Sequence, residues 1–212
     1  MAKKVLIIGA ARSGLAGAAF LAKQGNEVVL TDMIQAKQVD NLAALGVSFI
    51  WGEQPDVEAI QPDYIVISPG VPLTIPPVCY AKSHGIPVIG ELELAYRNCK
   101  APFVAITGTN GKTTTTTLVG ELLKKTGKQI SVGGNIGVPL IGYAGQLQAD
   151  DIVVAEVSSF QLETIEEFCP HLALILNLTP DHLDRHGDMA GYLAAKARIF
   201  ENQKEFDYLV LN

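Results

Sequence analysis

Short apolar runs alternate with amphipathic segments along the whole chain. Runs typical of buried strands lie at residues 5–8, 28–31, 64–68, 87–89, 103–107, 152–157, 172–178 and 208–211. Segments with apolar positions at helical spacing lie at residues 15–24, 39–45, 79–84, 91–97, 113–125 and 190–200. Strands that alternate with helices favour parallel sheets covered by helices. We therefore predict an α/β fold.

A polar segment near the middle of the chain divides this pattern. Residues 98–102 are short, polar and end in Pro102, and an apolar strand follows at once. We place a domain boundary there, which gives domains 1–98 and 99–212. The second domain closes on the apolar run 208–211, which would leave an apolar sheet edge exposed. We therefore expect an amino-terminal fragment of a longer polypeptide.

Composition narrows the class of protein. The chain has 212 residues, of which 48% are hydrophobic, and a net charge of −6 without a basic run. Such a charge argues against a nucleic-acid partner. The three cysteines form no C-x-x-C pair and fit a reducing compartment. No apolar segment approaches the length of a membrane span, and no signal peptide precedes the first strand. We expect a cytoplasmic protein without a membrane or nucleic-acid partner.

The most informative motif is Thr-Gly-Thr-Asn-Gly-Lys-Thr at residues 107–113, between a predicted strand and a predicted helix. This is the context of a P-loop, in which backbone N–H groups and a helix N-terminus face an anion. Lys112 would reach the β- and γ-phosphates, and the Thr113 hydroxyl would bind Mg²⁺. The usual spelling has glycine where Ile106 stands. An ordinary strand-to-helix turn is the alternative, but the context favours a nucleoside triphosphate site.

A second glycine turn, at residues 9–14, matches G-x-G-x-x-G at its outer positions but has Ala11 in the middle. Asp32 ends the next strand, where a ribose-binding carboxylate belongs in a Rossmann unit. Because the middle glycine admits a pyrophosphate, Ala11 weakens the NAD interpretation. Another nucleotide, or a turn without a ligand, remains open. The segment 68–70 ends another strand at the expected ligand edge, although Pro-Gly is also a common turn.

Further candidate groups lie in the second half. Glu156 ends an apolar strand and is placed to bind Mg²⁺, or is a solvated strand-end carboxylate. Residues 181–186 hold two His and two Asp, which favour Mg²⁺ over zinc, unless they are a chance polar loop. Residues 133–137 form a glycine-rich turn in which Asn135 could bond a ligand, or a plain loop. By pattern alone, Lys196 is a solvated helix lysine.

Together these motifs resemble those of the Mur ligase family. The loop at 107–113 is similar to the ATP loop that Mur ligases share with folylpolyglutamate synthases, and segments 133–137, 156–163 and 181–186 narrow the resemblance to Mur ligases. It extends from Gly9 to Lys196. It implies a Rossmann-like UDP-binding domain, followed by the first part of a P-loop ATPase-type central domain. The rest of that domain and a carboxyl-terminal domain would be absent, so the fragment alone would be inactive.

The resemblance also implies a reaction. ATP would phosphorylate the L-alanyl carboxylate of UDP-N-acetylmuramoyl-L-alanine, and the amine of D-glutamate would attack the acyl phosphate to form an amide of the peptidoglycan precursor. Two Mg²⁺ ions, these three small-molecule substrates and a monomeric enzyme are implied. Lys196 aligns with a carbamylated lysine of the family. Its reaction with CO₂ requires a neutral amine, which burial or a nearby cation favours.

The resemblance assigns the following residues by role. The catalytic residues implied are Lys112, His182 and Lys196. Those implied to bind ATP are Gly108, Thr109, Asn110, Gly111, Lys112, Thr113 and Thr114. Those implied to bind the UDP substrate are Arg12, Ser13, Asp32, Ser68, Gly70, Asn135, Ser158, Gln161 and Tyr192. Those implied at the metal ions are Thr113, Glu156, His182 and Lys196. Met33 and Ile34 depart from the family pattern, which often has Thr or Arg after the aspartate.

Three alternatives are weighed against this hypothesis. Another Mur ligase or a folylpolyglutamate synthase would share the ATP loop but not the Glu-Val-Ser-Ser stretch at 156–159. A nicotinamide-dependent oxidoreductase is supported only by Gly9, Gly14 and Asp32, and it leaves the P-loop unexplained. A non-catalytic nucleotide-binding module would retain affinity for the UDP-sugar without turnover.

Overall fold

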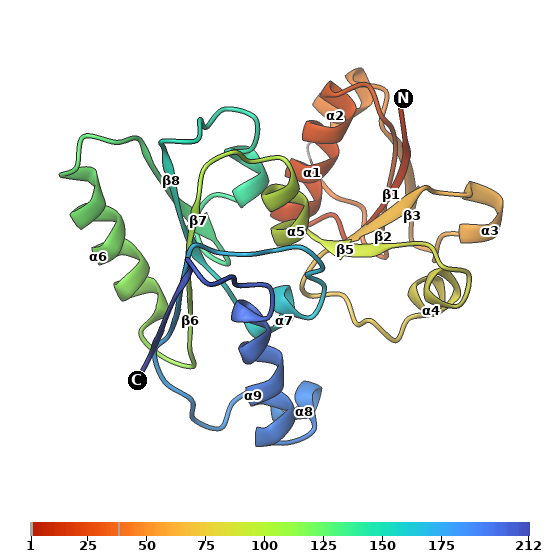
Figure 1. Ribbon diagram of the computed structural model, residues 1–212. Coiled ribbons are helices and arrows are strands. Elements are labelled where there is room, and N and C mark those ends of the chain that lie inside the picture. The colour runs from red at the N-terminus through yellow and green to blue at the C-terminus, as the bar shows by residue number, and fades with distance from the viewer. Residues whose placement is uncertain (1, 38) are drawn as a thin grey trace. The chain divides into compact units, whose positions relative to one another are not determined.

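The computed structural model describes residues 2–37 and 39–212. The chain forms two compact units, the first ending at Leu94 and the second beginning at Ala95. Each unit contains one five-stranded sheet in which all strand pairs are parallel (Figure 1). The predicted α/β class is confirmed, with a Rossmann-like unit followed by a unit built around a P-loop.

The first unit has the strand order β3-β2-β1-β4-β5. Its strands are β1 (Lys4–Ile8), β2 (Glu27–Asp32), β3 (Ser48–Trp51), β4 (Tyr64–Ile67) and β5 (Val88–Gly90). Its helices are α1 (Arg12–Lys23), α2 (Asp40–Ala44), α3 (Val57–Ile60) and α4 (Pro76–Ser83), and α5 (Glu91–Arg97) follows β5. The strand order reverses at β1, between β2 and β4. Such a switch point opens a crevice at the carboxyl ends of the strands, where ligands bind.

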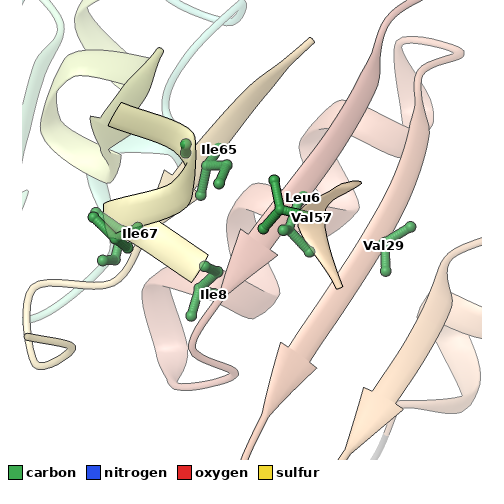
Figure 2. Packing of buried hydrophobic residues seen from close by; sticks show 8 residues of the cluster. Leu6, Ile8, Val29, Val57, Ile65 and Ile67 are labelled. Carbon is green, nitrogen blue, oxygen red and sulfur yellow. The ribbon is translucent and has the colours of Figure 1, made fainter. Parts of the chain in front are cut away.

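The core of the first unit follows from the alternation of side chains along its strands. One sheet face carries Leu6, Ile8 and Val29 with Ile65 and Ile67 of β4, all buried (Figure 2). Helices α3 and α4 cover this face with buried Val57, Val78 and Ala81. Burying such aliphatic side chains contributes roughly 1.5–3 kcal/mol each. This core fixes the strand ends that carry the candidate ligand residues.

The second unit has the strand order β10-β9-β6-β8-β7. Its strands are β6 (Phe103–Thr107), β7 (Ile130–Gly134), β8 (Ile152–Glu156), β9 (Leu172–Ile175) and β10 (Tyr208–Leu211). Its α-helices are α6 (Lys112–Lys124), α7 (Ser159–Leu162), α8 (Leu183–His186) and α9 (Met189–Ala197), with 3₁₀ helices η1 (Leu140–Gly142) and η2 (Arg198–Phe200). Central strand β6 lies between β8 and β9, so the loops after these three strands meet at one edge of the sheet.

Helix α6 is held on the sheet by a second apolar cluster. Val104 and Ile106 of β6 and Val154 of β8 are buried against Val119 and Leu123 of α6. In Figure 1, α6 lies on one side of this sheet and α9 on the other. The P-loop therefore joins a buried strand to a helix that is anchored by apolar packing.

Some elements differ from the sequence prediction. Strand β3 was not predicted, because its residues are only partly buried or exposed and its alternation is weak. Residues 133–134, predicted to be part of a turn, end strand β7. A Cβ at Gly134 would lie 2.3 Å from the Glu156 carbonyl oxygen, so glycine here reflects close approach to β8. The strand predicted over 172–178 ends at Ile175.

Strand β10 forms one edge of the second sheet and pairs with β9. All four of its residues are exposed, from 39% for Leu209 to 63% for Tyr208. Both apolar faces of this strand therefore meet solvent. In the part of the chain that the structure describes, no helix has the length and apolar character needed to cross a membrane.

Candidate nucleotide site

The P-loop turn connects β6 to α6 and surrounds an ammonium group. Gly108 has φ of +152° and Gly111 has φ of +81°, conformations that favour glycine. Lys112 begins α6, and its Nζ donates to the carbonyl oxygens of Gly108 at 2.9 Å and Thr109 at 2.8 Å. The turn thus combines a helix N-terminus with a cation, which is the arrangement that receives phosphate.

Asn177 supports the P-loop from the loop after β9. Its Oδ1 accepts hydrogen bonds from the backbone N–H groups of Thr109 at 3.1 Å and Asn110 at 2.8 Å. Its Nδ2 donates to the Asn110 carbonyl oxygen at 2.9 Å. Asn177 was not among the residues predicted for the site. The available signal was its position as the polar residue that follows the apolar run 172–176, beside a predicted strand end.

Glu156 brings two predicted site residues together. Thr113 Oγ1 donates to Glu156 Oε2 at 2.8 Å, and Asn135 Nδ2 donates to Glu156 Oε1 at 3.1 Å. Glu156 is 1% exposed at the end of β8. A hydroxyl and a carboxylate are oxygen ligands of the kind that Mg²⁺ takes in phosphoryl-transfer sites. Among the described residues, no group of three His, Cys, Asp or Glu gathers. Magnesium fits, because it commonly keeps waters and phosphate oxygens in its shell.

Lys196 is buried, although its helical spacing alone indicated a solvated side chain. It is 1% exposed, and its Nζ donates to the Gly108 carbonyl oxygen at 3.0 Å and to Thr107 Oγ1 at 3.4 Å. The Nζ also lies 4.7 Å from the centre of the Tyr192 ring. Desolvation, and then the charge of Lys112, lower the pKa of Lys196 to about 8, against the opposing effect of Asp181.

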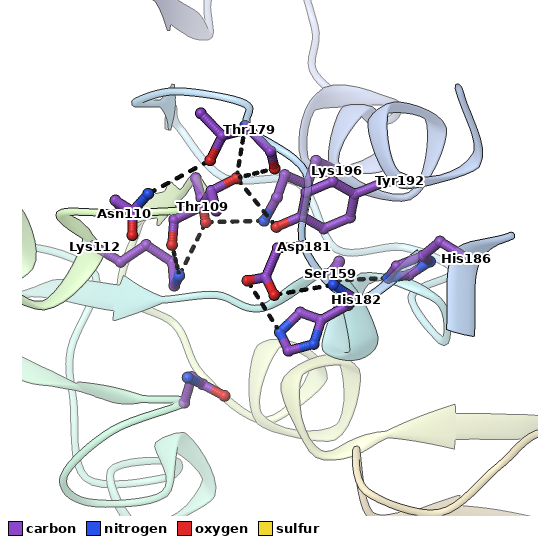
Figure 3. Close-up of polar contacts among 12 residues, drawn as sticks. Thr109, Asn110, Lys112, Ser159, Thr179, Asp181, His182, His186, Tyr192 and Lys196 are labelled. Carbon is purple, nitrogen blue, oxygen red and sulfur yellow. Dashed lines mark hydrogen bonds and ion pairs between the residues drawn. The ribbon is translucent and has the colours of Figure 1, made fainter. Parts of the chain in front are cut away.

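Tyr192 joins helix α9 to the P-loop (Figure 3). Its hydroxyl lies 3.3 Å from Thr109 Oγ1, which donates to the Thr179 carbonyl oxygen at 3.1 Å. Tyr192 is 1% exposed, and burial raises the pKa of its phenol. The phenol therefore stays neutral at physiological pH. Tyr192 and Lys196 both reach the P-loop from one helix.

His182 lies at the beginning of α8 in a left-handed backbone conformation, with φ of +50°. Its Nε2 is 3.5 Å from Asp181 Oδ2, and its backbone N–H donates to Asp181 Oδ1 at 3.0 Å. Its ring centre lies 4.9 Å from that of Phe160 and 6.5 Å from that of Tyr192. His182 is therefore linked to the P-loop residues through the Tyr192 ring.

Ser158 and Gln161 form the capping box that begins α7. Gln161 Oε1 accepts from Ser158 N at 3.0 Å and from the Ser158 hydroxyl at 3.1 Å, while Ser158 Oγ accepts from Gln161 N at 3.3 Å. Gln161 is 3% exposed, and Ser158 is half-buried. The Gln161 amide oxygen therefore caps the start of α7.

In the first unit, Asp32 and Gly70 line a cavity of about 220 Å³. Ile8, Val71 and Ile75 give it apolar walls. Asp32 Oδ2 accepts from Ala10 N at 2.7 Å, and Asp32 Oδ1 accepts from Ile34 N at 3.0 Å. The carboxylate therefore ties the glycine turn to the segment that follows β2, with further lone pairs left for a ligand.

Ser68, Arg12 and Ser13 surround the same turn. Ser68 is 7% exposed, and its Oγ donates to the Gly9 carbonyl oxygen at 3.1 Å. Arg12 and Ser13 form the first turn of α1, where Arg12 is exposed and Ser13 half-buried. In this structure, Ser68 supports the turn, whereas the other two lie where a ligand phosphate would meet the start of α1.

The second unit has the features of a P-loop nucleotide-binding domain: a parallel sheet, a lysine-bearing turn after its central strand, and a carboxylate from the next strand bonded to the threonine after that lysine. The chain belongs to the Mur ligase family. The profile described as Mur ligase middle domain matches residues 106–212, and the profile described as Mur ligase MurD-like, N-terminal domain matches residues 3–90.

Curated relatives are about half identical to this chain over the part that aligns. UDP-N-acetylmuramoylalanine–D-glutamate ligase from Pelotomaculum thermopropionicum is 55% identical over 99% of the chain and 47% of its own length. The enzyme of the same name from Exiguobacterium sibiricum is 50% identical, also over 99% of the chain and 47% of its own length. The chain therefore spans about half the length of these relatives.

Solved structures support the fold. The UDP-N-acetylmuramate:L-alanyl-γ-D-glutamyl-meso-diaminopimelate ligase from Neisseria meningitides has a TM-score of 0.64 at 22% identity, covering 100% of this chain and 72% of that one. UDP-N-acetylmuramate–alanine ligase from Thermotoga maritima has a TM-score of 0.58 at 23% identity, covering 99% and 49%. At this identity, the likeness concerns the fold.

Proposed function

We propose that this chain is part of an ATP-dependent amide ligase that adds D-glutamate to UDP-N-acetylmuramoyl-L-alanine. One observation carries the proposal: the ammonium groups of Lys112 and Lys196 both bond the Gly108 carbonyl oxygen, inside the P-loop. Two cations at one turn are costly unless an anion joins them or one of them changes charge. A ligase that places phosphates and a carbamylated lysine there meets both conditions. Sequence identity to the D-glutamate ligases supports the choice of substrates.

The P-loop residues bind ATP in this proposal. Residues Gly108 to Thr114 surround the phosphates with the backbone N–H groups that do not already donate to Asn177, and Lys112 offsets the negative charge of the phosphates. Thr113 and Glu156, whose side chains share a 2.8 Å hydrogen bond, would hold one Mg²⁺. When bound, Mg²⁺ stabilises the charge that builds on the transferring phosphoryl group. His182 would help to hold a second Mg²⁺, whose charge would favour the substrate carboxylate.

The reaction requires a better leaving group than oxide on the substrate carboxyl carbon. The L-alanyl carboxylate takes the γ-phosphoryl group of ATP, which leaves ADP and an acyl phosphate. The D-glutamate amine then attacks that carbon, loses a proton and expels phosphate as the amide forms. Lys112 remains beside the transferred group throughout, so its charge is present where negative charge develops.

Lys196 is suited to carbamylation because its amine is desolvated and lies near a second cation. Only a neutral amine reacts with CO₂, and the lowered pKa of about 8 increases the neutral fraction near physiological pH. The product carries a carboxylate. The repulsion between the Lys196 and Lys112 ammonium groups is thereby replaced by an attraction between the Lys196 carbamate and the Lys112 ammonium group. In this proposal the carbamate would help His182 to hold the second Mg²⁺.

The UDP part of the substrate binds in the first unit in this proposal. Asp32 and Gly70 line the apolar cavity that accepts the uridine, while Arg12, Ser13 and Ser68 lie at the turn before α1. The residues proposed to contact or adjoin the muramoyl part are Asn135, Ser158, Gln161 and Tyr192. We further propose a monomeric, cytoplasmic enzyme whose full length is needed for turnover.

Calorimetric titration of the 212-residue chain with UDP-N-acetylmuramoyl-L-alanine tests the substrate assignment, with NAD as the control ligand. Saturable binding of the UDP-sugar alone is the expected result. Binding of NAD alone would overturn the assignment of the first unit. If neither ligand binds, the same titration of the full-length enzyme decides, and failure there would reject the proposed substrate.

A further inference from the structure

A buried histidine joins the short helices beside the nucleotide site. The His186 side chain is 4% exposed at the last residue of α8. Its Nε2 lies 2.9 Å from Ser159 Oγ, at the first residue of α7 (Figure 3). Its Nδ1 lies 3.6 Å from Glu163 Oε1. Both ring nitrogens therefore face groups on or next to α7.

Glu163 is fixed in turn by Arg185, the neighbour of His186. Arg185 Nε donates to Glu163 Oε1 at 3.2 Å, and Arg185 Nη2 donates to Glu163 Oε2 at 2.5 Å. The guanidinium also lies over the Phe160 ring, 4.2 Å from its centre. Two consecutive residues of α8 thus hold α7 through charged and aromatic contacts. Bidentate pairing with arginine gives the carboxylate a defined orientation.

His186 and His182 touch the same two aromatic rings. The His186 ring centre lies 5.6 Å from that of Phe160 and 5.3 Å from that of Tyr192. The His182 ring contacts both as well, and it lies one helical turn before His186. A displacement of His186 would therefore move the surfaces against which His182 packs.

A histidine side chain that lies between a serine hydroxyl and a glutamate carboxylate also occurs in the catalytic triads of acyl-transfer enzymes. Ser159, however, is 2% exposed and lies in the first turn of a helix. A nucleophile must have space beside it for an acyl carbon, and a buried hydroxyl has none. The Ser159–His186 hydrogen bond therefore connects α7 to α8 and does not activate Ser159 as a nucleophile.

His182 needs such support from its surroundings. Its φ of +50° is unfavourable for a residue with a side chain, and such backbone persists when neighbouring contacts impose it. The Asp181 carboxylate, which lies 3.5 Å from the ring, belongs to the preceding residue and moves with His182. The contacts that tie α8 to α7 are instead at the other end of the helix, at Arg185 and His186.

We propose that His186 is a positioning residue that holds His182 in place for the second Mg²⁺, through Ser159 and through the rings of Phe160 and Tyr192. The inference rests on the proposed function in giving His182 a metal-binding role. Burial lowers the pKa of His186, which keeps its ring neutral. We assign the ring proton to Nδ1, which lies 3.6 Å from the Glu163 carboxylate, so that Nε2 can accept from the Ser159 hydroxyl.

The first test uses the 212-residue chain and needs no turnover. Ring-¹⁵N-labelled histidine gives separate ¹H–¹⁵N signals for the four histidines, which single substitutions assign. His186→Phe keeps a ring for packing but removes both nitrogens. We expect it to shift and broaden the His182 signals while those of His171 and His84 stay in place. Unchanged His182 signals would overturn the proposal. The control His171→Phe, at a histidine that pairs with Asp207, should leave His182 unaffected.

The second test separates positioning from general stability in the full-length enzyme. His186→Phe should raise the Mg²⁺ concentration for half-maximal activity by about tenfold, with the KM for the UDP-sugar within about twofold. His186→Gln can still accept from Ser159 and should recover most of the Mg²⁺ response. A wild-type Mg²⁺ response in His186→Phe would reject the inference. If wild type itself forms no amide, the proposed function fails, and the histidine spectra still decide the positioning role.

A folding control keeps the result interpretable. Thermal unfolding is measured for each variant, and if His186→Phe does not fold, Ser159→Ala takes its place. That variant removes one hydroxyl and should move the His182 signals in the same direction by a smaller amount. Its failure to move them would count against the Ser159–His186 link.

Discussion

Lys112 and Lys196 share one acceptor, the Gly108 carbonyl oxygen, at 2.9 and 3.0 Å from their ammonium nitrogens. The first lysine arrives from the start of α6 and the second from α9. Two like charges at one oxygen repel each other, and Lys196 is additionally desolvated. The turn therefore carries an excess of positive charge before any ligand binds, which favours anions and a neutral Lys196.

Replacement of Lys196 by methionine should stabilise the 212-residue chain and abolish ligation by the full-length enzyme. The pKa of Lys196 falls from 10.5 to about 8 on folding, so its charge opposes folding. This cost is fully present below about pH 8 and disappears as the pH rises to 10.5, where the unfolded chain also loses the proton. We expect a gain of about 1–2 kcal/mol at pH 7 in urea unfolding, after allowance for solvent screening, and less at pH 10.

The matched control for that measurement is Lys204→Met, at an exposed lysine. It should change the free energy of unfolding by no more than about 0.5 kcal/mol at either pH. An equal effect of both substitutions would show that burial of Lys196 charge is not the cause.

Carbamylation of Lys196 should be visible directly. The chain is placed in ¹³C-bicarbonate, and the carbamate carbon is followed by ¹³C NMR from pH 6 to pH 9. The signal should grow as the pH rises toward about 8, because the neutral amine is the reacting form. It should be absent in Lys196→Ala. A signal that persists in that variant belongs to another amine and would reject the assignment.

Glu156→Gln should weaken metal binding while it preserves the strand. The amide is nearly the same size and can still bond the Thr113 hydroxyl, but it lacks the negative charge that holds Mg²⁺. We expect Mg²⁺ affinity to fall by about 10–100-fold, measured by Mn²⁺ competition in electron paramagnetic resonance. Thr113→Ser keeps the hydroxyl and should bind nearly as wild type. Equal affinity of wild type and Glu156→Gln would remove Glu156 from the metal site.

Asn177→Leu should loosen the P-loop. It removes the acceptor for the Thr109 and Asn110 N–H groups and the donor to the Asn110 carbonyl oxygen. We expect a loss of about 1–3 kcal/mol in the free energy of unfolding, and weaker binding of a fluorescent ATP analogue. Asn177→Asp keeps both acceptor interactions and should retain most of the affinity. If Asp and Leu lower it equally, the acceptor role is wrong.

Asp32→Ala should weaken binding of the UDP-sugar by about 1–3 kcal/mol if the carboxylate accepts a ligand hydrogen bond. The same change also frees Ala10 N and Ile34 N, so unfolding must be measured beside the titration. Asp32→Asn keeps one acceptor oxygen and separates the two effects. A variant with normal affinity and lowered stability would leave Asp32 with the structural role alone.

The sequence predicted the features that are local. The strand before the P-loop, the glycine turn and the Glu156 strand end all depend on neighbours in sequence, and each lies where the pattern placed it. Period, turn chemistry and a strand-end carboxylate are sufficient for such elements. The pairing of Thr113 with Glu156 also follows, because adjacent parallel strands end at one edge.

Features set by distant contacts were not predictable from the residues alone. Lys196 has the spacing of an exposed helix position, and only the packing of α9 on the P-loop buries it. Asn177 supports a loop that lies 67 residues earlier in the chain. His186 belonged to a dense polar cluster in the sequence, but its burial between two aromatic rings depends on how α7, α8 and α9 assemble.

In the first glycine turn, the fold requires glycine at two positions, and only the ligand can restrict the third. A Cβ at Gly14 would lie 1.8 Å from the Gly9 carbonyl oxygen, and one at Gly9 would lie 2.6 Å from the Ser68 Cβ. The strand-to-helix crossing itself therefore excludes side chains at both positions, whatever ligand binds. Ala11 is exposed at the start of α1, with φ of −76°, and the backbone imposes no such limit there. In a saturation library selected only for folding, positions 9 and 14 should remain glycine, whereas position 11 should accept many residue types. In a library selected for substrate binding, the residues accepted at position 11 should be restricted, because the ligand and not the fold limits the side chain there.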